Sequence, residues 1–361
     1  MKKLLFSANT LDLGGIEKAL VTWINYLAST GKYELTLVLE KKQGIFLEKL
    51  DKKVKVIEYV PSHNKIALQR KIINMCKRLN FIFKYKNKFD FSASFATYSQ
   101  MGSFVARTAS RNCALWGHAD YLELYNGNKE EMKKFFKMLQ YDKFKKYVFV
   151  SEEGKQSFEK CFQNQSGKVY VCNNMINSKE IIELSNEAIE EKKKQDITFL
   201  NVGRHDETQK CLTRLIEASK KLKQEGYKFR VLMIGDGPDS KKYKELVLRD
   251  KLGDTIVFMG RKQNPYPYFK ISDVVVLTSD YEGYPVVFLE SMALGKTIIT
   301  TNVSGSSSVE TGKYGIVTEK NTDSIYAAMK YYIENGYEPS KFDVDMFNKD
   351  MKEKMEKIIE E

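Results

Sequence analysis

The chain has 361 residues, of which 42% are hydrophobic and 29% charged, and a formal net charge of +12. This length suits two domains, and no apolar run approaches the ~20 residues of a membrane span. Five cysteines without a C-x-x-C pair and three histidines predict neither a disulfide framework nor a zinc site, and they fit a reducing, cytoplasmic compartment. The positive charge predicts an anionic partner: nucleotide, nucleic acid or membrane surface.

The chain opens with a strand pattern at Leu4 to Ser7, which we interpret as structure and not as a secretory signal. A loop from Asn9 to Gly15 leads into a helix from Ile16 to about Leu27. Gly14 and Gly15 would let the backbone approach a ligand closely. A simple strand-to-helix turn is an equally open alternative.

Further strands and helices continue this α/β alternation through the first half. His118 follows a short strand, and Ser151 begins a helix with acidic residues in its first turn. The predicted strands are Glu34–Leu39, Val54–Tyr59, Phe91–Phe95, Tyr147–Val150 and Val169–Cys172, and the predicted helices are Asn64–Lys88 and Lys129–Lys145.

Two of these segments are basic and amphipathic. Asn64 to Lys88 has eight basic residues, no acidic ones and an apolar stripe at helical spacing. Such helices bind anionic membrane interfaces. The alternative is that the apolar residues pack on the first domain and the cations are solvated. The second segment has Lys133, Lys134, Lys137, Lys143, Lys145 and Lys146 interleaved with Phe135, Phe136 and Phe144.

A polar run from Ser185 to Asp196 marks a solvated connection between two domains. After it the alternation restarts with strand Ile197–Val202, a loop, and helix Leu212–Gln224. We therefore expect domains at 1–174 and 196–340, a connection at 175–195, and a terminal segment, 341–361, whose helix crosses back to the first domain. Later strands are expected at Val231–Ile234 and Ile256–Met259, and the terminal helix at about Phe342–Glu361.

The most informative stretch runs from Asp273 to Thr301. A buried parallel strand, Val274–Leu277, precedes a polar turn and a helix from about Pro285 to Leu294, and a second strand, Thr297–Thr301, follows. Ligands of such units bind at the carboxyl end of the strand. Glu282 lies in the turn, and Glu290 lies on an apolar helix stripe where a charge needs a partner. A sugar diol would serve, although a neighbouring backbone group is the alternative.

This stretch resembles the E-x7-E signature of family 4 glycosyltransferases, which are retaining enzymes. The resemblance implies a GT-B fold of two Rossmann-like doubly wound domains facing a central cleft. It implies that Glu282 contacts the donor sugar, with the backbone of Gly283, Tyr284 and Pro285 beside sugar and phosphate. It also implies that Glu290 contacts the nucleotide ribose.

Other segments match the same family. Gly14-Gly15-Ile16-Glu17 resembles its G-G-x-E/R loop, and His118 occupies the place of a histidine near the sugar and acceptor. Arg204 and Lys210 match the pair that holds the donor pyrophosphate, although Cys211 replaces the usual glycine. Gly235 lies in a G-D-G-P turn at the rim of the nucleotide site, and Arg261 at the edge that accepts the base. Ser304 to Ser308 departs from the family's G-G-x-x-E run, and Glu310 is a candidate for the missing glutamate.

These features predict a retaining glycosyltransferase that moves a hexose or N-acetylhexosamine, with a UDP-sugar favoured, to a glycan hydroxyl. The acceptor is expected to be lipid-linked, in surface polysaccharide biosynthesis, with the enzyme peripheral on the inner face of the membrane. No cofactor or metal is expected, because the one D-x-D, Asp343 to Asp345, lies in the tail. A soluble or protein-linked acceptor remains open. A nicotinamide-dependent oxidoreductase would need a G-x-G-x-x-G, and a nucleic-acid-binding protein would need a recognised module.

Overall fold

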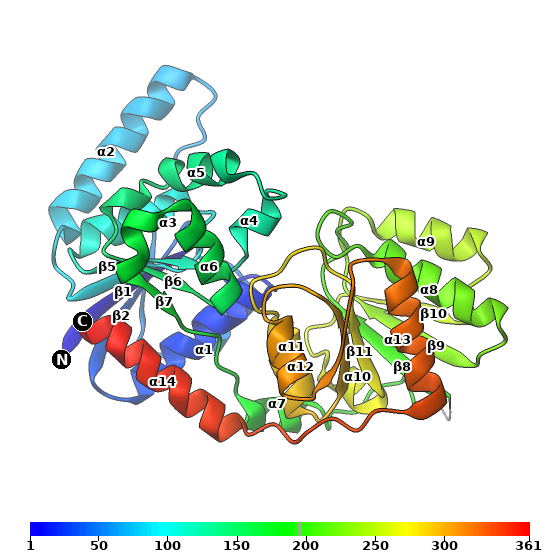
Figure 1. Ribbon diagram of the computed structural model, residues 1–361. Coiled ribbons are helices and arrows are strands. Elements are labelled where there is room, and N and C mark those ends of the chain that lie inside the picture. Colours follow the sequence, from blue (N-terminus) through cyan, green and yellow to red (C-terminus); the bar gives the residue numbers. More distant parts are fainter. Residues whose placement is uncertain (194–195) are drawn as a thin grey trace. The chain divides into compact units, whose positions relative to one another are not determined.

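The computed structural model describes residues 1–193 and 196–361, and for residues 164, 166 and 167 it describes the backbone alone. The chain divides into two compact units, the first formed by residues 1–175 and 348–361 and the second by residues 176–347. Each unit has its own parallel sheet with helices on both faces (Figure 1). Two Rossmann-like α/β domains were predicted from the sequence, and the structure confirms them.

The first sheet has the strand order β3-β2-β1-β4-β5-β6-β7. Figure 1 shows α3, α5 and α6 on one side of it and α1 and α14 on the other. Its strands are β1 (Lys2–Ala8), β2 (Tyr33–Leu39), β3 (Lys55–Glu58), β4 (Phe91–Ser94), β5 (Cys113–Gly117), β6 (Lys146–Phe149) and β7 (Val169–Val171). Its helices are α1 (Gly15–Ser29), α2 (Ala67–Tyr85), α3 (Gln100–Ala109), α4 (Tyr121–Leu124), α5 (Lys129–Met138) and α6 (Glu152–Cys161), with 3-10 turns at Ile45–Lys49, Tyr141–Lys143 and Gln163–Lys168.

The second sheet has the order β10-β9-β8-β11-β12-β13. Its strands are β8 (Ile197–Val202), β9 (Phe229–Ile234), β10 (Ile256–Gly260), β11 (Val274–Leu277), β12 (Thr297–Thr301) and β13 (Gly315–Thr318). Its helices are α7 (Ser178–Leu184), α8 (Leu212–Gln224), α9 (Ser240–Arg249), α10 (Tyr266–Ile271), α11 (Val286–Ala293), α12 (Ser306–Thr311) and α13 (Thr322–Asn335). The strand order reverses between β8 and β11, so the carboxyl ends of these two strands form the topological switch point where open α/β sheets bind ligands.

The last helix, α14 (Val344–Glu360), begins in the second unit and continues in the first. Its C-terminal carbonyl groups accept hydrogen bonds from the first unit. The ammonium of Lys146, a residue only 4% exposed, donates to the Ile358 carbonyl, and Asn112 donates to the Ile359 carbonyl at 3.3 Å. A buried cation at a helix C-terminus is stabilised by the negative end of the helix dipole, so Lys146 fastens α14 to the first sheet.

The segment Lys129–Lys145 was predicted as one continuous helix, and this was wrong. Helix α5 ends at Met138, and Gln140 takes a left-handed backbone conformation with φ +55°. Its aromatic residues do not form an interfacial face: Phe136 and Phe144 are 1% exposed and Phe135 packs against the same core cluster. Burying each such ring stabilises the fold by about 1.5–3 kcal/mol, which explains why the aromatic residues of this segment turn inward.

The polar run predicted at Ser185–Asp196 is, over its described residues 185–193, part of the second unit and not a freely solvated connection. Arg230, at the start of β9 and 3% exposed, pairs with the Glu191 carboxylate. The Arg230 guanidinium also donates to the Lys192 carbonyl at 2.7 Å and to the Thr198 hydroxyl at 2.9 Å. A buried guanidinium needs such partners. Lys194 and Gln195, which also belong to this predicted connection, lie outside the described residues.

Candidate functional site

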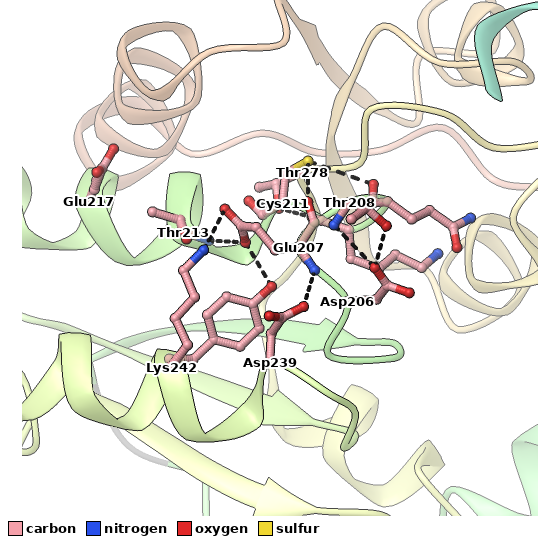
Figure 2. Close-up of polar contacts among 12 residues, drawn as sticks. Asp206, Glu207, Thr208, Cys211, Thr213, Glu217, Asp239, Lys242 and Thr278 are labelled. Carbon is pink, nitrogen blue, oxygen red and sulfur yellow. Dashed lines mark hydrogen bonds and ion pairs between the residues drawn. The ribbon is translucent and has the colours of Figure 1, made fainter. Parts of the chain in front are cut away.

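The loop after β8 carries Arg204 and Lys210 and closes into a compact turn. The Asp206 carboxylate accepts from the Thr208 backbone amide at 3.1 Å and from the Thr208 hydroxyl at 2.6 Å. The Lys210 amide donates to the Asp206 carbonyl at 2.7 Å. Figure 2 shows these contacts gathered around Asp206. An aspartate that hydrogen-bonds the backbone two residues ahead fixes a tight turn. The backbone of the loop that carries Arg204 and Lys210 is therefore fixed.

Glu207 anchors this loop to the neighbouring helices (Figure 2). Its carboxylate accepts from the Tyr243 hydroxyl at 2.7 Å and from the Thr213 amide at 3.3 Å, in the first turn of α8. The Glu207 amide donates to Asp239 at 2.8 Å. The sequence analysis did not single out Glu207. Its partners Thr213 and Tyr243 lie on α8 and α9, and Asp239 lies just before α9, so only the fold brings them together.

Cys211 ends the loop with its backbone in the left-handed region, at φ +48° and ψ +45°. The family's glycine takes this conformation freely, whereas a residue with a Cβ atom pays of order 1–2 kcal/mol. The Cys211 side chain is buried, and its thiol lies 3.2 Å from the Glu207 carbonyl. The Cys211 backbone therefore keeps the conformation in which the family's glycine is expected, and the burial raises the pKa of the thiol to about 12.

The loop after β11 holds Glu282 beneath the surface. Glu282 is 7% exposed, and the buried Ser279 hydroxyl donates to its Oε1 at 2.7 Å. The Thr301 hydroxyl in turn donates to the Ser279 carbonyl at 2.6 Å. A carboxylate fixed in this way keeps its second oxygen at a constant position, as recognition of a ligand hydroxyl requires.

The two loops are joined by hydrogen bonds as well as by charge. The Asp280 amide donates to the Gln209 carbonyl at 2.8 Å, and the Thr278 hydroxyl donates to the Lys210 carbonyl at 2.8 Å. The Lys210 ammonium forms an ion pair with the Glu282 carboxylate. Residues predicted separately as phosphate-binding and sugar-binding are thus in direct contact.

Arg204, on the same loop as Lys210, is exposed and has no ion pair with the residues that the structure describes. Arg214, which the sequence analysis did not name, instead pairs with Asp280 at 2.6 Å and donates to the Thr278 carbonyl at 3.1 Å. Arg214 therefore stabilises the loop, whereas Arg204 remains available to a ligand.

Glu290 is 6% exposed on α11, among the apolar side chains of that helix. Its Oε1 accepts a hydrogen bond from the Tyr266 hydroxyl at 2.9 Å, and Tyr266 is itself 4% exposed at the start of α10. Sequence reasoning required a partner for this buried charge and suggested a ligand diol. The structure supplies a phenol, which no signal in the sequence identifies.

The turn from Gly283 to Pro285 is buried. The helix was predicted to begin at about Pro285, whereas in the structure Pro285 is the N-cap residue and α11 begins at Val286. The Tyr284 hydroxyl lies 2.9 Å from the Ser308 hydroxyl. Gly305, at φ +86°, lies against the Tyr284 ring, where a Cβ atom would come within 2.8 Å. The Ser304–Ser308 segment therefore supports Tyr284. Glu310 is exposed on α12.

Gly235 and Arg261 lie at the neighbouring strand ends. Gly235 has φ +145°, and a Cβ atom there would meet the Gly203 carbonyl oxygen at 1.8 Å, so this turn needs glycine. Arg261 is exposed, 3.8 Å from Asp236. His205, 2% exposed, hydrogen-bonds Ser240 at 2.9 Å, and burial lowers its pKa. These contacts make the G-D-G-P turn a rigid rim.

The remaining predicted residues belong to the first unit. Gly14 caps α1 in an extended conformation, and a Cβ atom there would clash with the Glu17 carboxylate at 2.2 Å. Glu17 accepts from the Tyr98 hydroxyl at 3.1 Å, and burial raises the pKa of Glu17. Gly15 begins α1, so in this structure Gly14 makes room for a side chain of the same helix.

His118 follows β5, and its ring packs against Phe95 with centroids 4.6 Å apart. Burial lowers its pKa to about 3. Its Nε2 is buried and has no hydrogen-bond partner among the described residues. His118 is therefore a neutral imidazole at physiological pH.

Comparison with known proteins shows that this chain is similar to glycosyltransferases. Residues 183–353 match the family model described as Glycosyl transferases group 1. An uncharacterized glycosyltransferase of Methanocaldococcus jannaschii is 27% identical over 68% of this chain, and the match spans 60% of that relative's own length. A putative colanic acid biosynthesis glycosyltransferase of Salmonella typhimurium is 33% identical over 37% of this chain and 34% of its own length.

A longer match is to a Campylobacter jejuni protein named N-acetylgalactosamine-N,N'-diacetylbacillosaminyl-diphospho-undecaprenol 4-alpha-N-acetylgalactosaminyltransferase. It is 24% identical over 93% of this chain and 91% of its own length. Among solved structures, Anabaena HepE in complex with UDP and glucose superposes with a TM-score of 0.78 at 17% identity, over 99% of this chain and 100% of that one. The fold is GT-B, as predicted, and the matches support a group 1 glycosyltransferase.

Proposed function

We propose that this chain is a retaining, metal-independent glycosyltransferase that moves a hexose or N-acetylhexosamine from a UDP-sugar to a hydroxyl of a lipid-linked glycan. The observation that carries the proposal is the contact of Lys210 with Glu282 at the carboxyl ends of β8 and β11. A cation for phosphate and a carboxylate for sugar hydroxyls are the two groups that a nucleotide-sugar site needs within reach of each other.

In the proposed complex the donor diphosphate lies beside Arg204, Lys210 and the N-terminus of α8. Departure of the diphosphate develops negative charge on its leaving oxygen, and two fixed cations stabilise that charge. The thirteen-residue α8 adds the positive end of its dipole. Because protein groups supply this charge, we expect no requirement for a divalent metal.

Glu282 would accept hydrogen bonds from donor-sugar hydroxyls, and Glu290 from the ribose hydroxyls. The backbone of Gly283, Tyr284 and Pro285 would pack along sugar and phosphate. The acceptor hydroxyl would attack the anomeric carbon on the face that the diphosphate leaves. The bond from the anomeric carbon to the acceptor oxygen forms as the bond to the phosphate oxygen breaks, and that phosphate oxygen takes the hydroxyl proton. Configuration is thereby retained without a protein nucleophile.

The proposal of a lipid-linked acceptor draws support from helix α2. Within α2, Phe81 is the one described side chain that is buried, while Phe83 is 87% and Leu68 68% exposed. No acidic residue occurs from Asn64 to Lys88. No helix within the described ranges is long and apolar enough to span a membrane. An exposed helix with this composition suits adsorption to the anionic inner leaflet, where a lipid-linked glycan of surface polysaccharide assembly would be met.

Two experiments test the proposal. A screen of nucleotide sugars, with and without EDTA, should reveal hydrolysis or transfer of one UDP-sugar in both conditions. Hydrolysis that depends strictly on Mg²⁺ would contradict the roles given to Arg204 and Lys210. The anomeric configuration of the product, read by NMR coupling constants, tests retention separately.

Membrane binding is tested by sedimentation with phosphatidylglycerol and phosphatidylcholine vesicles at low and high salt. Replacing Leu68 and Phe83 by serine should weaken binding to the anionic vesicles roughly tenfold. A matched control replaces Leu248 and Met346, which are 80% and 72% exposed in the second unit, and should leave it unchanged. Equal loss in both variants, or no salt-sensitive binding, would count against a membrane-bound acceptor.

A further inference from the structure

A groove in the first unit, which contains none of the residues assigned to the donor site, is lined with lysines. Its volume is about 1090 Å³. We call it the lysine groove and define it by five side chains: Lys129, Lys133, Lys134 and Lys137 on α5, and Lys160 in the last turn of α6. Three carboxylates, of Glu130, Glu131 and Asp142, also line it.

Five lysines and three carboxylates leave the groove with a net charge of +2. Lys133 pairs with Glu130 at 2.9 Å. Lys129, Lys134, Lys137 and Lys160 have no ion pair with any residue that the structure describes, and all four are exposed. Unpaired lysines that converge on a concave surface raise the local concentration of anions.

The lysines of α5 are arranged as a row. Lys129, Lys133 and Lys137 are spaced four residues apart, so their Cα atoms follow one face of the helix at steps of about 6 Å. The ammonium groups of Lys129 and Lys133 lie near enough to the Cys161 thiol to act on its pKa, which burial raises. The row on α5 and the end of α6 therefore face the same space.

Aromatic rings form part of the wall. Tyr141 and Phe162 both line the groove, and their ring centroids lie 4.5 Å apart. Phe162 is 7% exposed and Tyr141 is half-buried. Apolar rings beside a few polar or charged groups are typical of sites that bind small organic ligands, which a bare phosphate site does not require.

The groove does not suit a membrane surface. Interfacial helices insert an apolar face, whereas Phe136 and Phe144 of this segment are 1% exposed in the core. Met138, 48% exposed, is the one large apolar side chain of α5 that is exposed among the described residues. A concave surface with outward lysines fits a chain-like polyanion better than a lipid bilayer.

We propose that the lysine groove binds an acidic saccharide chain. Carboxylate or phosphate groups on successive sugars would contact the lysine row, and a sugar ring would lie against Tyr141. This site takes no part in the donor chemistry, and its binding is measured without any nucleotide. Failure at the donor site would therefore leave the inference open to its own test.

The test uses the full chain and oligogalacturonate of defined length at low salt. The groove variant carries glutamine at Lys129, Lys134, Lys137 and Lys160. The control carries glutamine at four other lysines that are exposed in the same unit, Lys52, Lys53, Lys55 and Lys349. Its substitutions remove the same number of positive charges. Because each exposed charge contributes little by itself, we expect about tenfold weaker binding in the groove variant and less than about twofold in the control. Circular dichroism and melting curves establish that both variants fold.

Further probes separate a saccharide site from other polyanion sites. Neutral maltooligosaccharide of the same length should bind far more weakly than oligogalacturonate. Tyr141→Leu, which keeps an apolar contact with Phe162, should weaken oligogalacturonate binding but leave inorganic tripolyphosphate unchanged. Equal losses in the groove and control variants, indifference of oligogalacturonate to Tyr141→Leu, or loss of phosphatidylglycerol-vesicle binding in place of saccharide binding would each overturn the proposal.

Discussion

Lys210 and Glu282 form an ion pair although 72 positions separate them in the chain. Their side chains are 20% and 9% exposed, so the pair is largely shielded from water. In the proposed complex the diphosphate would compete with Glu282 for the lysine, and the donor sugar would then engage the released carboxylate. The pair thus couples phosphate binding to sugar recognition.

The first prediction follows from this competition. Glu282→Gln should bind UDP more tightly than wild type, by roughly threefold to tenfold, because its neutral amide no longer competes for Lys210. Glu338→Gln, which removes an exposed carboxylate in the second unit that is assigned to no site, is the matched control and should leave UDP affinity unchanged. Calorimetric titration with UDP decides. Weaker UDP binding in Glu282→Gln than in Glu338→Gln would mean that the diphosphate and Glu282 do not compete for Lys210.

The second prediction concerns Tyr266. Tyr266→Phe removes one hydrogen bond that orients the Glu290 carboxylate, so it should weaken UDP binding about tenfold. Inhibition by pyrophosphate should stay unchanged, because Glu290 is assigned to the ribose. Tyr268→Phe is the control on the same helix, since the 6% exposed Tyr268 has no recorded hydroxyl hydrogen bond to a described residue. An equal loss of pyrophosphate binding would show that Tyr266 maintains the structure of the whole site and does not act specifically through Glu290 on the ribose.

The main elements of the fold, and the candidate site residues Arg204, Lys210, Glu282 and Glu290, could be predicted from the sequence. The strand β11 and the Glu282 turn are recognisable because β-branched runs, glycine and proline are local signals. Tyr266, Ser279, Glu207 and Arg230 could not be predicted, since each acts through a contact with a distant part of the chain. Periodicity alone also failed at Lys129–Lys145. Gln140 ends the helix there in a backbone conformation that few residues adopt, and tertiary packing determines it.

The third prediction uses the backbone at Cys211. Glycine tolerates φ +48° whereas alanine does not, so Cys211→Gly should be more stable than Cys211→Ala by about 1 kcal/mol. Urea unfolding of both variants measures this. Cys161, in the last turn of α6, provides the opposite control, because in a helix alanine should exceed glycine by about 0.5–1 kcal/mol. If the alanine variant is more stable than the glycine variant at both positions, the backbone strain assigned to Cys211 is contradicted.

The fourth prediction concerns pH and His118. Its pKa is about 3 in the folded chain and ordinarily near 6.5, so the unfolded state binds more protons between these values. Above pH 6.5 His118 is neutral in both states and does not make the free energy of unfolding depend on pH. As the pH falls from 6.5 toward 3, the unfolded state takes up the proton and the free energy of unfolding decreases. His118→Gln should therefore lose less stability than wild type between pH 6.5 and 4.5, by up to about 2 kcal/mol. Parallel denaturation curves for wild type and His118→Gln would contradict this account. His205→Gln is a useful comparison, since burial lowers that pKa too.

The central claim is that the loops after β8 and β11 form the donor site. The most direct measurement is turnover of the UDP-sugar selected by the screen, in wild type, Lys210→Ala, Glu282→Gln and Glu338→Gln. Circular dichroism and melting on the same samples report the fold. The account predicts that Lys210→Ala and Glu282→Gln stay folded and lose about a hundredfold or more in turnover, while Glu338→Gln stays near wild type. Near-normal turnover by a folded Glu282→Gln enzyme would contradict it.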